Sequence, residues 1–387
     1  MPIRSHRLPD SFAPNPLSLA LANLRERGEE VLDLTLANPT ACGLEFPSAA
    51  LGEALGDPQV LRYQPDSRGS AAAREAVASW HGHGVGVDDL ILTASTSEAY
   101  TWLFKLLCNP GDEVLVPSPS YPLFDWLARL EGITATAVPS YWHERWHLDA
   151  GALEEACTPR TRALVLVNPN NPTGHFLSRP EWDQVLEFCA QWKLSLIVDE
   201  VFTSYALEAP EDHLPTALET PQPPCPLFVL SGLSKVAALP QIKLGWIIAR
   251  GDRARALLEP LAFIADQFLS VSASAQAAAG VALAAAPGLQ EQLLARLKGN
   301  LQELDRQLEA CPALSRLPVE GGWSVLLRRP ALGSDEDCAL GLLQEARVLV
   351  HPGHFFDLPG EGYLVLSLLP KPEVFAEGIR RICSALA

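Results

Sequence analysis

The chain has 387 residues, of which 48% are hydrophobic and 19% are charged, and its formal net charge is −17. This composition is typical of a globular protein with a large core and two domains. The acidic balance argues against a nucleic-acid partner, although a local basic patch can still bind an anion. Eight cysteines occur without CxxC pairs or the Cys/His spacing of a metal site. We therefore expect free thiols in a reducing cytoplasm, and no metal.

The sequence predicts no membrane contact. Near the N-terminus, Pro9, Asp10 and Pro14 interrupt any apolar core, so no signal peptide is indicated. The most apolar long stretch, residues 270–286, is rich in alanine and broken by serine and glutamine. This pattern predicts a buried helix rather than a membrane span.

Apolar runs alternate with helix-like patterns through the first two thirds of the chain. Before them we expect an arm, a helix over 17–27, a short strand over 31–36, a turn-rich loop over 63–69 and a helix over 71–81. The predicted strands are 89–93, 113–116, 134–138, 163–167, 194–198, 227–230 and 244–249, with helices at 97–108, 123–130 and 179–192. This alternation predicts an α/β fold with a mostly parallel, seven-stranded sheet between helices. In such sheets the ligand binds beyond the C-terminal ends of the strands.

The pattern changes after Pro287. A helix is predicted over 289–308, and shorter strands and helices follow at 322–327, 335–346, 348–350, 363–368 and 372–386. This order is typical of a smaller α+β domain. We divide the chain into an arm and segment that joins the small domain (1–45), a large domain (46–286) and a small C-terminal domain (287–387).

Chemically active side chains follow several predicted strands. They are, in chain order, Ser95, Thr96 and Ser97, then Tyr121, Asn171, Asp199, and Ser234 with Lys235. Hydroxyl groups at a helix N-terminus can bind phosphate or simply cap the helix. A lysine after a strand is usually a surface residue, but one between buried strands has a lowered pKa and can attack an aldehyde. Together, a lysine, a carboxylate, an amide, an aromatic ring and a phosphate cup at one edge are what pyridoxal phosphate needs.

Five motifs in order resemble the fold-type I pyridoxal phosphate enzymes, specifically the class I/II aminotransferases. They are Tyr63 to Gly69 with Ala73-Arg74-Glu75-Ala76-Val77, Pro110-Gly111-Asp112-Glu113-Val114 with Pro119-Ser120-Tyr121, Asn171-Pro172-Thr173-Gly174, Asp199-Glu200-Val201, and Ser234-Lys235. Each motif alone is weak evidence, since the Asn-Pro-Thr-Gly run can be a simple turn. The presence of all five motifs in the family's order is specific evidence for the resemblance, which covers residues 31–245.

The resemblance implies a role for each cofactor-binding residue. Lys235 would hold the cofactor as a Schiff base and shuttle the substrate proton. Asp199 would pair with the pyridinium nitrogen, Asn171 would hydrogen-bond the phenolic oxygen, and Tyr121 would stack on the ring. The remaining positions would bind phosphate: Ser95, Thr96, Ser97, Ser234 and Lys243 in the same subunit, and Tyr63 in the neighbouring one. The family pattern thus implies a homodimer with shared active sites, while Glu200 and Arg74 would serve structure.

Four positions depart from the family pattern. Lys243 stands where arginine is usual, so it keeps the charge but loses bidentate geometry, unless it is a surface lysine. Phe202 replaces a tyrosine, which removes one hydrogen bond to the cofactor. Gly232 replaces a serine and could allow a close backbone approach. Val365 replaces the arginine that normally binds the substrate carboxylate.

The resemblance suggests three other candidates for substrate binding. Ala37 and Asn38 lie in residues 34–39, which resemble the family's substrate loop. His354 lies in residues 351–356, which resemble the small-domain loop near the substrate. A histidine there can be cationic and bind a carboxylate, or it can simply cap the loop, and both interpretations stay open.

We predict an aminotransferase that moves an amino group from an amino acid to a 2-oxo acid through Lys235, in a ping-pong cycle. The alternative is a pyridoxal phosphate-dependent lyase, decarboxylase or oxidase on the same fold, because the way a substrate is held decides which bond breaks. A non-catalytic binding protein with this fold is a third hypothesis, and the joint presence of Lys235, Asp199 and Asn171 argues against it.

Overall fold

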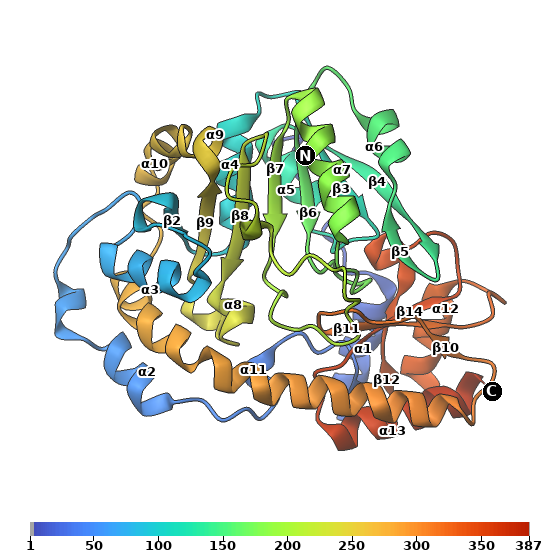
Figure 1. The fold of residues 1–387 in the computed structure, drawn as a ribbon. Helices are drawn as coiled ribbons and strands as arrows, with labels where there is room; N and C mark the ends of the chain where they lie inside the picture. Colours follow the sequence, from blue (N-terminus) through green and yellow to red (C-terminus); the bar gives the residue numbers. More distant parts are fainter. Residues whose placement is uncertain (1–3, 387) are drawn as a thin grey trace.

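Eight strands form one large sheet in the computed structural model, which describes residues 4–386 (Figure 1). Their order across the sheet is β2-β9-β8-β7-β6-β3-β4-β5. The strands are β2 (Leu90–Thr93), β3 (Glu113–Ser118), β4 (Thr134–His143), β5 (Arg145–Leu148), β6 (Thr161–Val167), β7 (Ser195–Asp199), β8 (Leu227–Gly232) and β9 (Gly245–Arg250). Strands β8, β7, β6, β3 and β4 run parallel, while β9 is antiparallel to both of its neighbours. The mostly parallel α/β fold is therefore confirmed.

The predicted count of seven strands is one too low. All seven expected strands are present, and β5 adds an eighth by pairing antiparallel with an extended β4. The hairpin of β4 and β5 turns at Glu144, where φ is +60°. Trp146 on β5 is only 2% exposed, so burial of this indole stabilises a strand that has no long apolar run.

Helices cover both faces of the large sheet. In β2, Leu90 and Leu92 pack into one core, while Ile91 packs into a second core on the opposite face. This alternation follows from the two-residue period of a strand. The first face is covered by α2 (Ser48–Leu55), α3 (Ala71–His81), α6 (Ala150–Ala156), α7 (Arg179–Trp192), α8 (Leu233–Val236) and part of α11 (Ala273–Leu308). The second is covered by α4 (Thr96–Leu107), α5 (Phe124–Glu131), α9 (Gly251–Arg255) and α10 (Leu258–Asp266).

A four-stranded antiparallel sheet, here called the C-terminal sheet, has the order β10-β11-β14-β13. Its strands are β10 (Ser315–Arg316), β11 (Ser324–Arg328), β13 (His351–Pro352) and β14 (Tyr363–Ser367), and α12 (Asp335–Gly341) and α13 (Pro372–Leu386) accompany it. The N-terminal segment lies here too: β1 (Leu32–Asp33) pairs with β12 (Val348–Leu349), and α1 (Pro16–Glu26) shares its hydrophobic core. Figure 1 shows this blue segment among the red C-terminal elements. These contacts support the proposed division into domains.

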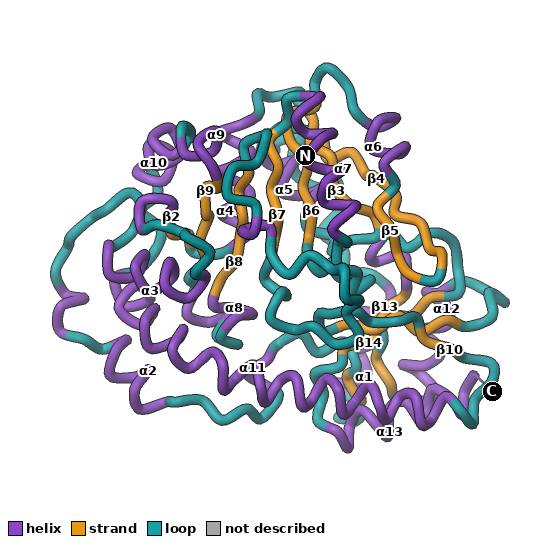
Figure 2. The backbone as a smooth tube through the Cα atoms, viewed as in Figure 1, coloured by secondary structure: helices purple, strands orange, loops and turns teal. Residues whose placement is uncertain are grey.

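Helix α11 runs unbroken across the proposed boundary at residue 286 (Figure 2). The sequence predicts two helices here, because proline inside a helix removes a hydrogen bond and costs about 3 kcal/mol. The helix nevertheless continues through Pro287, with Ala286 buried in the core of the large sheet and Leu293 buried in the core of the C-terminal sheet. Burial at both ends therefore outweighs the proline. No helix within residues 4–386 is long and apolar enough to cross a membrane.

Candidate active site

A cavity of about 410 Å³ lies between the C-terminal ends of the parallel strands and the C-terminal sheet. Ten of the residues predicted from the sequence line it: Ala37, Ser95, Thr96, Ser97, Tyr121, Asn171, Asp199, Ser234, Lys235 and Lys243. They come from separate segments of the chain, and the parallel strands bring most of them to one edge. The arrangement expected from the strand ends is thus present, while the individual roles stay proposals.

Lys235 lies in an apolar part of this cavity. Its Nζ is 4.8 Å from the centre of the Trp323 ring and 5.6 Å from the centre of the Phe202 ring. Burial lowers the pKa of Lys235, and the negative charge of Asp199 partly opposes this change. A lysine with a lowered pKa is more often neutral, which a nucleophilic amine requires.

Asp199 is buried at the end of β7. Burial raises the pKa of its carboxyl group to about 6, although three contacts favour the charged form. The backbone N–H of Val201 donates to it at 3.1 Å, the Tyr100 hydroxyl donates at 3.0 Å, and Lys235 attracts it. A pyridinium nitrogen beside this carboxyl group would hold it ionised. Tyr100 was not predicted from the sequence, although a buried tyrosine on α4 needs a partner for its hydroxyl.

The N-terminus of α4 lies against Gly245, which pairs with Gly232. Ser95 caps this helix, and its hydroxyl accepts a hydrogen bond from the Glu98 N–H at 3.2 Å. Gly232 and Gly245 face each other across β8 and β9. A Cβ on Gly245 would lie 3.1 Å from the carbonyl carbon of Ser95, and one on Gly232 would lie 3.0 Å from the Leu244 carbonyl oxygen. The absent side chains let the backbone approach closely, as expected for Gly232.

The groups at this end of the cavity fit a phosphate. They are the N-terminal turn of α4, its hydroxyl residues, Ser234 and the ammonium of Lys243. A helix N-terminus favours an anion through its free N–H groups and its dipole. With Asp199 and Lys235 in the same cavity, the residues present fit pyridoxal phosphate as a whole.

Asn171 is held by a residue that was not predicted from the sequence. Its Oδ1 accepts a hydrogen bond from the Ser324 hydroxyl on β11 at 3.2 Å, so its NH₂ group stays available to donate. Phe202 lines the cavity without a hydroxyl, as the sequence dictates. The nearby Tyr205 does not replace it, because its hydroxyl donates to the backbone carbonyl of Lys235 at 2.6 Å.

Three predicted site residues lie outside this cavity. Asn38 is exposed, and its side chain caps a short turn by accepting from the Thr40 N–H at 3.1 Å. His354 is also exposed, with its ring against Phe355. Tyr63 is 84% exposed and lines a separate groove of about 780 Å³. Within this chain, none of the three completes the site.

The C-terminal sheet and the residue that precedes β11 supply cavity-lining residues that were not predicted. Trp323, Ser324, His351 and Ser367 line the cavity beside Val365. Within residues 4–386, no arginine lines it. Val365 is 3% exposed and packs in an apolar cluster with Trp146, Leu326 and Phe356. The substitution at the arginine position therefore leaves an apolar wall in this part of the cavity.

Glu200 and Arg74 hold the backbone, as expected. Glu200 accepts hydrogen bonds from the Thr216 hydroxyl at 2.7 Å and the Ala217 N–H at 2.6 Å. Burial raises the pKa of its carboxyl group to about 7. Arg74 donates to the backbone carbonyls of Gly69 and Val87 at 2.9 and 2.8 Å. Neither residue lines the cavity.

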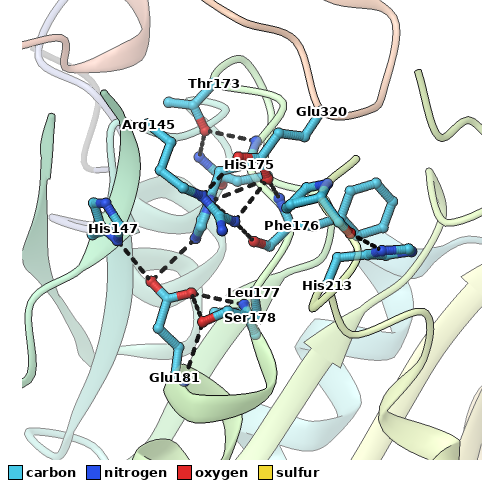
Figure 3. A network of polar contacts seen from close by, with 12 residues as sticks. Arg145, His147, Thr173, His175, Phe176, Leu177, Ser178, Glu181, His213 and Glu320 are labelled. Carbon is cyan, nitrogen blue, oxygen red and sulfur yellow. Dashed lines mark hydrogen bonds and ion pairs between the residues drawn. The ribbon is translucent and has the colours of Figure 1, made fainter. Parts of the chain in front are cut away.

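A buried polar network follows directly after the Asn171 motif (Figure 3). His175 lies 3.5 Å from Glu181 on one side and 3.5 Å from Glu320 on the other. Arg145 on β5 donates to Glu320 at 3.0 Å and to the Phe176 carbonyl at 2.9 Å. Glu181 lies on α7, whereas Glu320 precedes β11. The network therefore ties the turn after Asn171 to the C-terminal sheet.

A large mostly parallel sheet with these residues at its carboxyl edge defines a pyridoxal phosphate-dependent enzyme of fold type I. The chain matches the model of the aminotransferase class I and II family over residues 31–382, and it belongs to that family. It is an aminotransferase that acts on an amino acid and a 2-oxo acid.

Several relatives and solved structures are similar along nearly the whole chain. The alanine aminotransferase of Mycobacterium tuberculosis is 29% identical over 380 residues, which cover 95% of this chain and 88% of that protein. The glutamate-pyruvate aminotransferase AlaA of Escherichia coli is 27% identical over 370 residues, covering 92% and 90%. The structure of alanine aminotransferase from Pyrococcus furiosus matches with a TM-score of 0.89 at 26% identity, over 99% of both chains.

Proposed function

We propose that this aminotransferase holds pyridoxal phosphate on Lys235 and uses the same amine to move the proton at the substrate α-carbon. The observation that carries the proposal is the meeting of Lys235, Asp199 and Asn171 in one cavity, although each lies at or after the end of a different strand. The lowered pKa of Lys235 suits both roles, because a neutral amine can attack a carbonyl and accept a proton.

Each group in the cavity has a distinct task in this proposal. When bound, pyridoxal phosphate withdraws electrons from the substrate α-carbon and carries the amino group between the two half-reactions. Asp199 keeps the ring nitrogen protonated by its charge, and the NH₂ group of Asn171 donates to the phenolic oxygen. Tyr121 covers the ring. The phosphate is bound by Ser95, Thr96, Ser97, Ser234 and Lys243.

We propose the interconversion of L-alanine and pyruvate as the first half-reaction to test. The relatives named above are alanine and glutamate-pyruvate aminotransferases. The apolar wall around Val365, Phe356 and Trp323 suits a small uncharged side chain. A lyase reaction is the second candidate, because Val365 removes the arginine that fixes the substrate carboxylate in the family pattern.

We propose a homodimer in which Tyr63 reaches the phosphate of the neighbouring subunit. Tyr63 and Leu61 are 84% and 86% exposed, and they line a groove with Leu269 and Trp102. Exposed apolar groups on one face are typical of an interaction surface. Sedimentation should therefore give twice the chain mass, and Tyr63→Ala should weaken cofactor binding.

A cytoplasmic location is proposed from the cysteines, which are all free in the described chain.

The visible spectrum of the purified protein tests the proposal. Pyridoxal phosphate should give an absorbance band that L-alanine removes and pyruvate restores. Catalytic release of pyruvate, ammonia and hydrogen sulfide from L-cysteine, without an acceptor, would instead indicate a lyase. If the wild-type protein forms no band and Lys235→Ala behaves identically, the cofactor assignment is wrong.

A further inference from the structure

The cavity holds few groups that can carry charge. Within residues 4–386 they are Lys235, Lys243, Asp199 and His351, besides the phenols of Tyr100 and Tyr121. The proposed function assigns Lys235, Lys243 and Asp199 to the cofactor. Among the described residues that line the cavity, His351 is therefore the remaining group that can offer a positive charge to a substrate.

The pairing of two strands places His351 beside the position of the missing arginine. His351 on β13 and Val365 on β14 are direct partners in an antiparallel pair. Directly opposite residues project to the same face, with Cβ atoms about 4.5–5.5 Å apart. Both residues line the cavity, together with Ser324 and Ser367 from the adjoining strand positions. An imidazole at position 351 can thus reach the space that an arginine at 365 would enter.

The surroundings of His351 leave its ring free to bind a ligand. The ring is half-buried, and its centre lies 5.7 Å from those of Phe355 and Phe356. Burial lowers the pKa of His351, and the nearby Asp33 on β1 opposes this effect. No hydrogen bond to another residue of the described chain contributes to this pKa. The ring nitrogens are therefore not committed to a structural partner.

We propose that His351 binds the α-carboxylate of the substrate, in place of the arginine that the family has at position 365. The proposal rests on the proposed function, since it needs Lys235 and Asp199 to be engaged by the cofactor. One imidazole offers a single charge-assisted hydrogen bond, whereas an arginine offers two parallel ones. The substrate is then held with more rotational freedom about its α-carbon.

Binding through His351 makes carboxylate affinity depend on pH. A bound carboxylate favours the protonated imidazole, so binding takes up a proton when the free ring is neutral. Affinity should then fall by up to tenfold per pH unit above the pKa of free His351. The other titratable groups around the cavity are Asp33, Asp199, Lys235 and Lys243, and they are the same in a His351 variant. A comparison of variant and wild type therefore isolates the contribution of His351.

Calorimetric titration of the holoenzyme with propionate tests the proposal between pH 5 and 8. Propionate carries a carboxylate but no amino group, so it binds without reacting. His351→Gln keeps a polar side chain of similar reach but cannot become charged. We expect it to weaken propionate binding roughly ten- to hundredfold at pH 5.5, as for the loss of a charge-assisted hydrogen bond, and to flatten the pH dependence. KM for L-alanine should rise with little change in kcat.

His354→Gln is the matched control, because it removes an exposed imidazole three positions away on the same loop. Its propionate affinity should stay within twofold of the wild-type value. The double variant His351→Gln with Val365→Arg should recover binding and make it independent of pH, since arginine stays charged.

Two outcomes would overturn the assignment. One is a wild-type holoenzyme that binds no propionate, and the other is a His351→Gln holoenzyme whose affinity and pH profile match the wild type. Either result counts against the role of His351 only when the absorbance band of the bound cofactor is present. Absence of that band in the wild-type protein would mark the failure of the proposed function instead, so the two failures are distinguishable.

Discussion

The hydroxyl group of Tyr205 donates a hydrogen bond to the backbone carbonyl of Lys235 at 2.6 Å. Tyr205 is fully buried, and its ring packs edge-on against Trp323 at 5.1 Å. The contact fixes the main chain at the residue whose amine reaches into the cavity. Tyr205 therefore acts on the site through the backbone of Lys235. Phe202, which lines the cavity, has no hydroxyl group to offer there.

Tyr205→Phe should destabilise the protein by about 1 kcal/mol, the net value of one hydrogen bond. The effect stays small because the Ala238 N–H also donates to the Lys235 carbonyl, at 3.3 Å. Urea unfolding measures the free energy, and the rate at which L-alanine removes the cofactor band reports on Lys235. Tyr141→Phe is the control, since that ring is 50% exposed. Equal unfolding midpoints for Tyr205→Phe and wild type would contradict the prediction.

Tyr100→Phe should shift the pH range in which the protein binds its cofactor. The Tyr100 hydroxyl donates to Asp199 at 3.0 Å and helps to lower a carboxyl pKa that burial raises to about 6. Without this hydrogen bond the pKa rises, so Asp199 is protonated at a higher pH and loses its charge toward the pyridinium. As the pH is lowered, cofactor affinity should therefore begin to fall at a higher pH in the variant than in the wild type. At a pH below both pKa values, the affinity of the variant should be lower by roughly tenfold for each unit by which the pKa is raised.

Equilibrium binding of pyridoxal phosphate to the apoprotein between pH 5 and 8 measures this effect. Asp199→Asn shows the affinity that remains when residue 199 carries no charge, because an amide is neutral at every pH. This variant should bind pyridoxal phosphate weakly, and titration of residue 199 should no longer change its affinity. If the Tyr100→Phe and wild-type profiles coincide, the hydroxyl does not influence the charge of Asp199.

Gly245→Ala should weaken binding of the cofactor phosphate. The new Cβ would lie 3.0 Å from the Thr93 hydroxyl oxygen, 3.1 Å from the Ser95 carbonyl carbon and 3.2 Å from the Ser231 carbonyl oxygen. Two of these atoms belong to the backbone, so the start of α4 must move. We expect a loss of about 1–3 kcal/mol in stability. Affinity should fall more for pyridoxal phosphate than for pyridoxal, which lacks the phosphate.

Gly299→Ala is the matched control for this substitution. Gly299 lies inside α11, and apart from its chain neighbours and the backbone of its own helix, no atom lies within 4 Å of the place that an added methyl group would take. Alanine there should stabilise the protein by about 0.5–1 kcal/mol and leave cofactor affinity unchanged. If Gly245→Ala lowers the affinities for pyridoxal phosphate and for pyridoxal by the same factor relative to wild type, the effect is not specific to the phosphate.

The large sheet and its edge could be predicted because their signals are local. Apolar runs mark the parallel strands, and Asn171, Asp199 and Lys235 each follow one of them. Helix α3 even begins and ends where expected, at Ala71 and His81. Parallel topology then brings the strand ends together without further information.

The C-terminal sheet could not be predicted in this way. Its strands are short, and a shift of one residue in their pairing turns every side chain to the opposite face. The order of residues alone therefore offers no basis for choosing between the two histidines of one loop, and the prediction of His354 is not supported by the cavity lining. The pairing of β13 with β14 places His351 at the cavity instead. Trp323 and Ser324 were missed for the same reason.

His175 offers a test of the buried network that joins α7 to the C-terminal sheet (Figure 3). Burial lowers the pKa of His175, but Glu181 and Glu320 together outweigh burial and raise it above its ordinary value. Glu181 is buried as well, yet His175 and Ser178 lower the pKa of this carboxyl group to about 2. At mildly acidic pH the network thus holds a protonated histidine beside the ionised Glu181.

His175→Gln should therefore cost most stability in that pH range. The His175 contribution is complete below the unfolded-state pKa of about 6.5 and is lost as the pH rises through the higher folded-state value. The Glu181 contribution is complete above about 4.5 and is lost as the pH falls toward 2. Between these limits we expect a loss of about 3 kcal/mol, as for the breaking of a buried ion pair.

Urea unfolding of wild type and His175→Gln from pH 4 to pH 9 measures the difference directly. Asp199 and Glu200 titrate in both proteins, so their effects cancel. His147→Gln is the control, because that ring is 3.8 Å from Glu181 and more exposed, and it should cost less than about 1 kcal/mol. A His175→Gln difference that stays constant across this range would mean that His175 does not change its charge there. A difference that shrinks as the pH rises would establish the charged histidine as the group that holds α7 to the loop before β11.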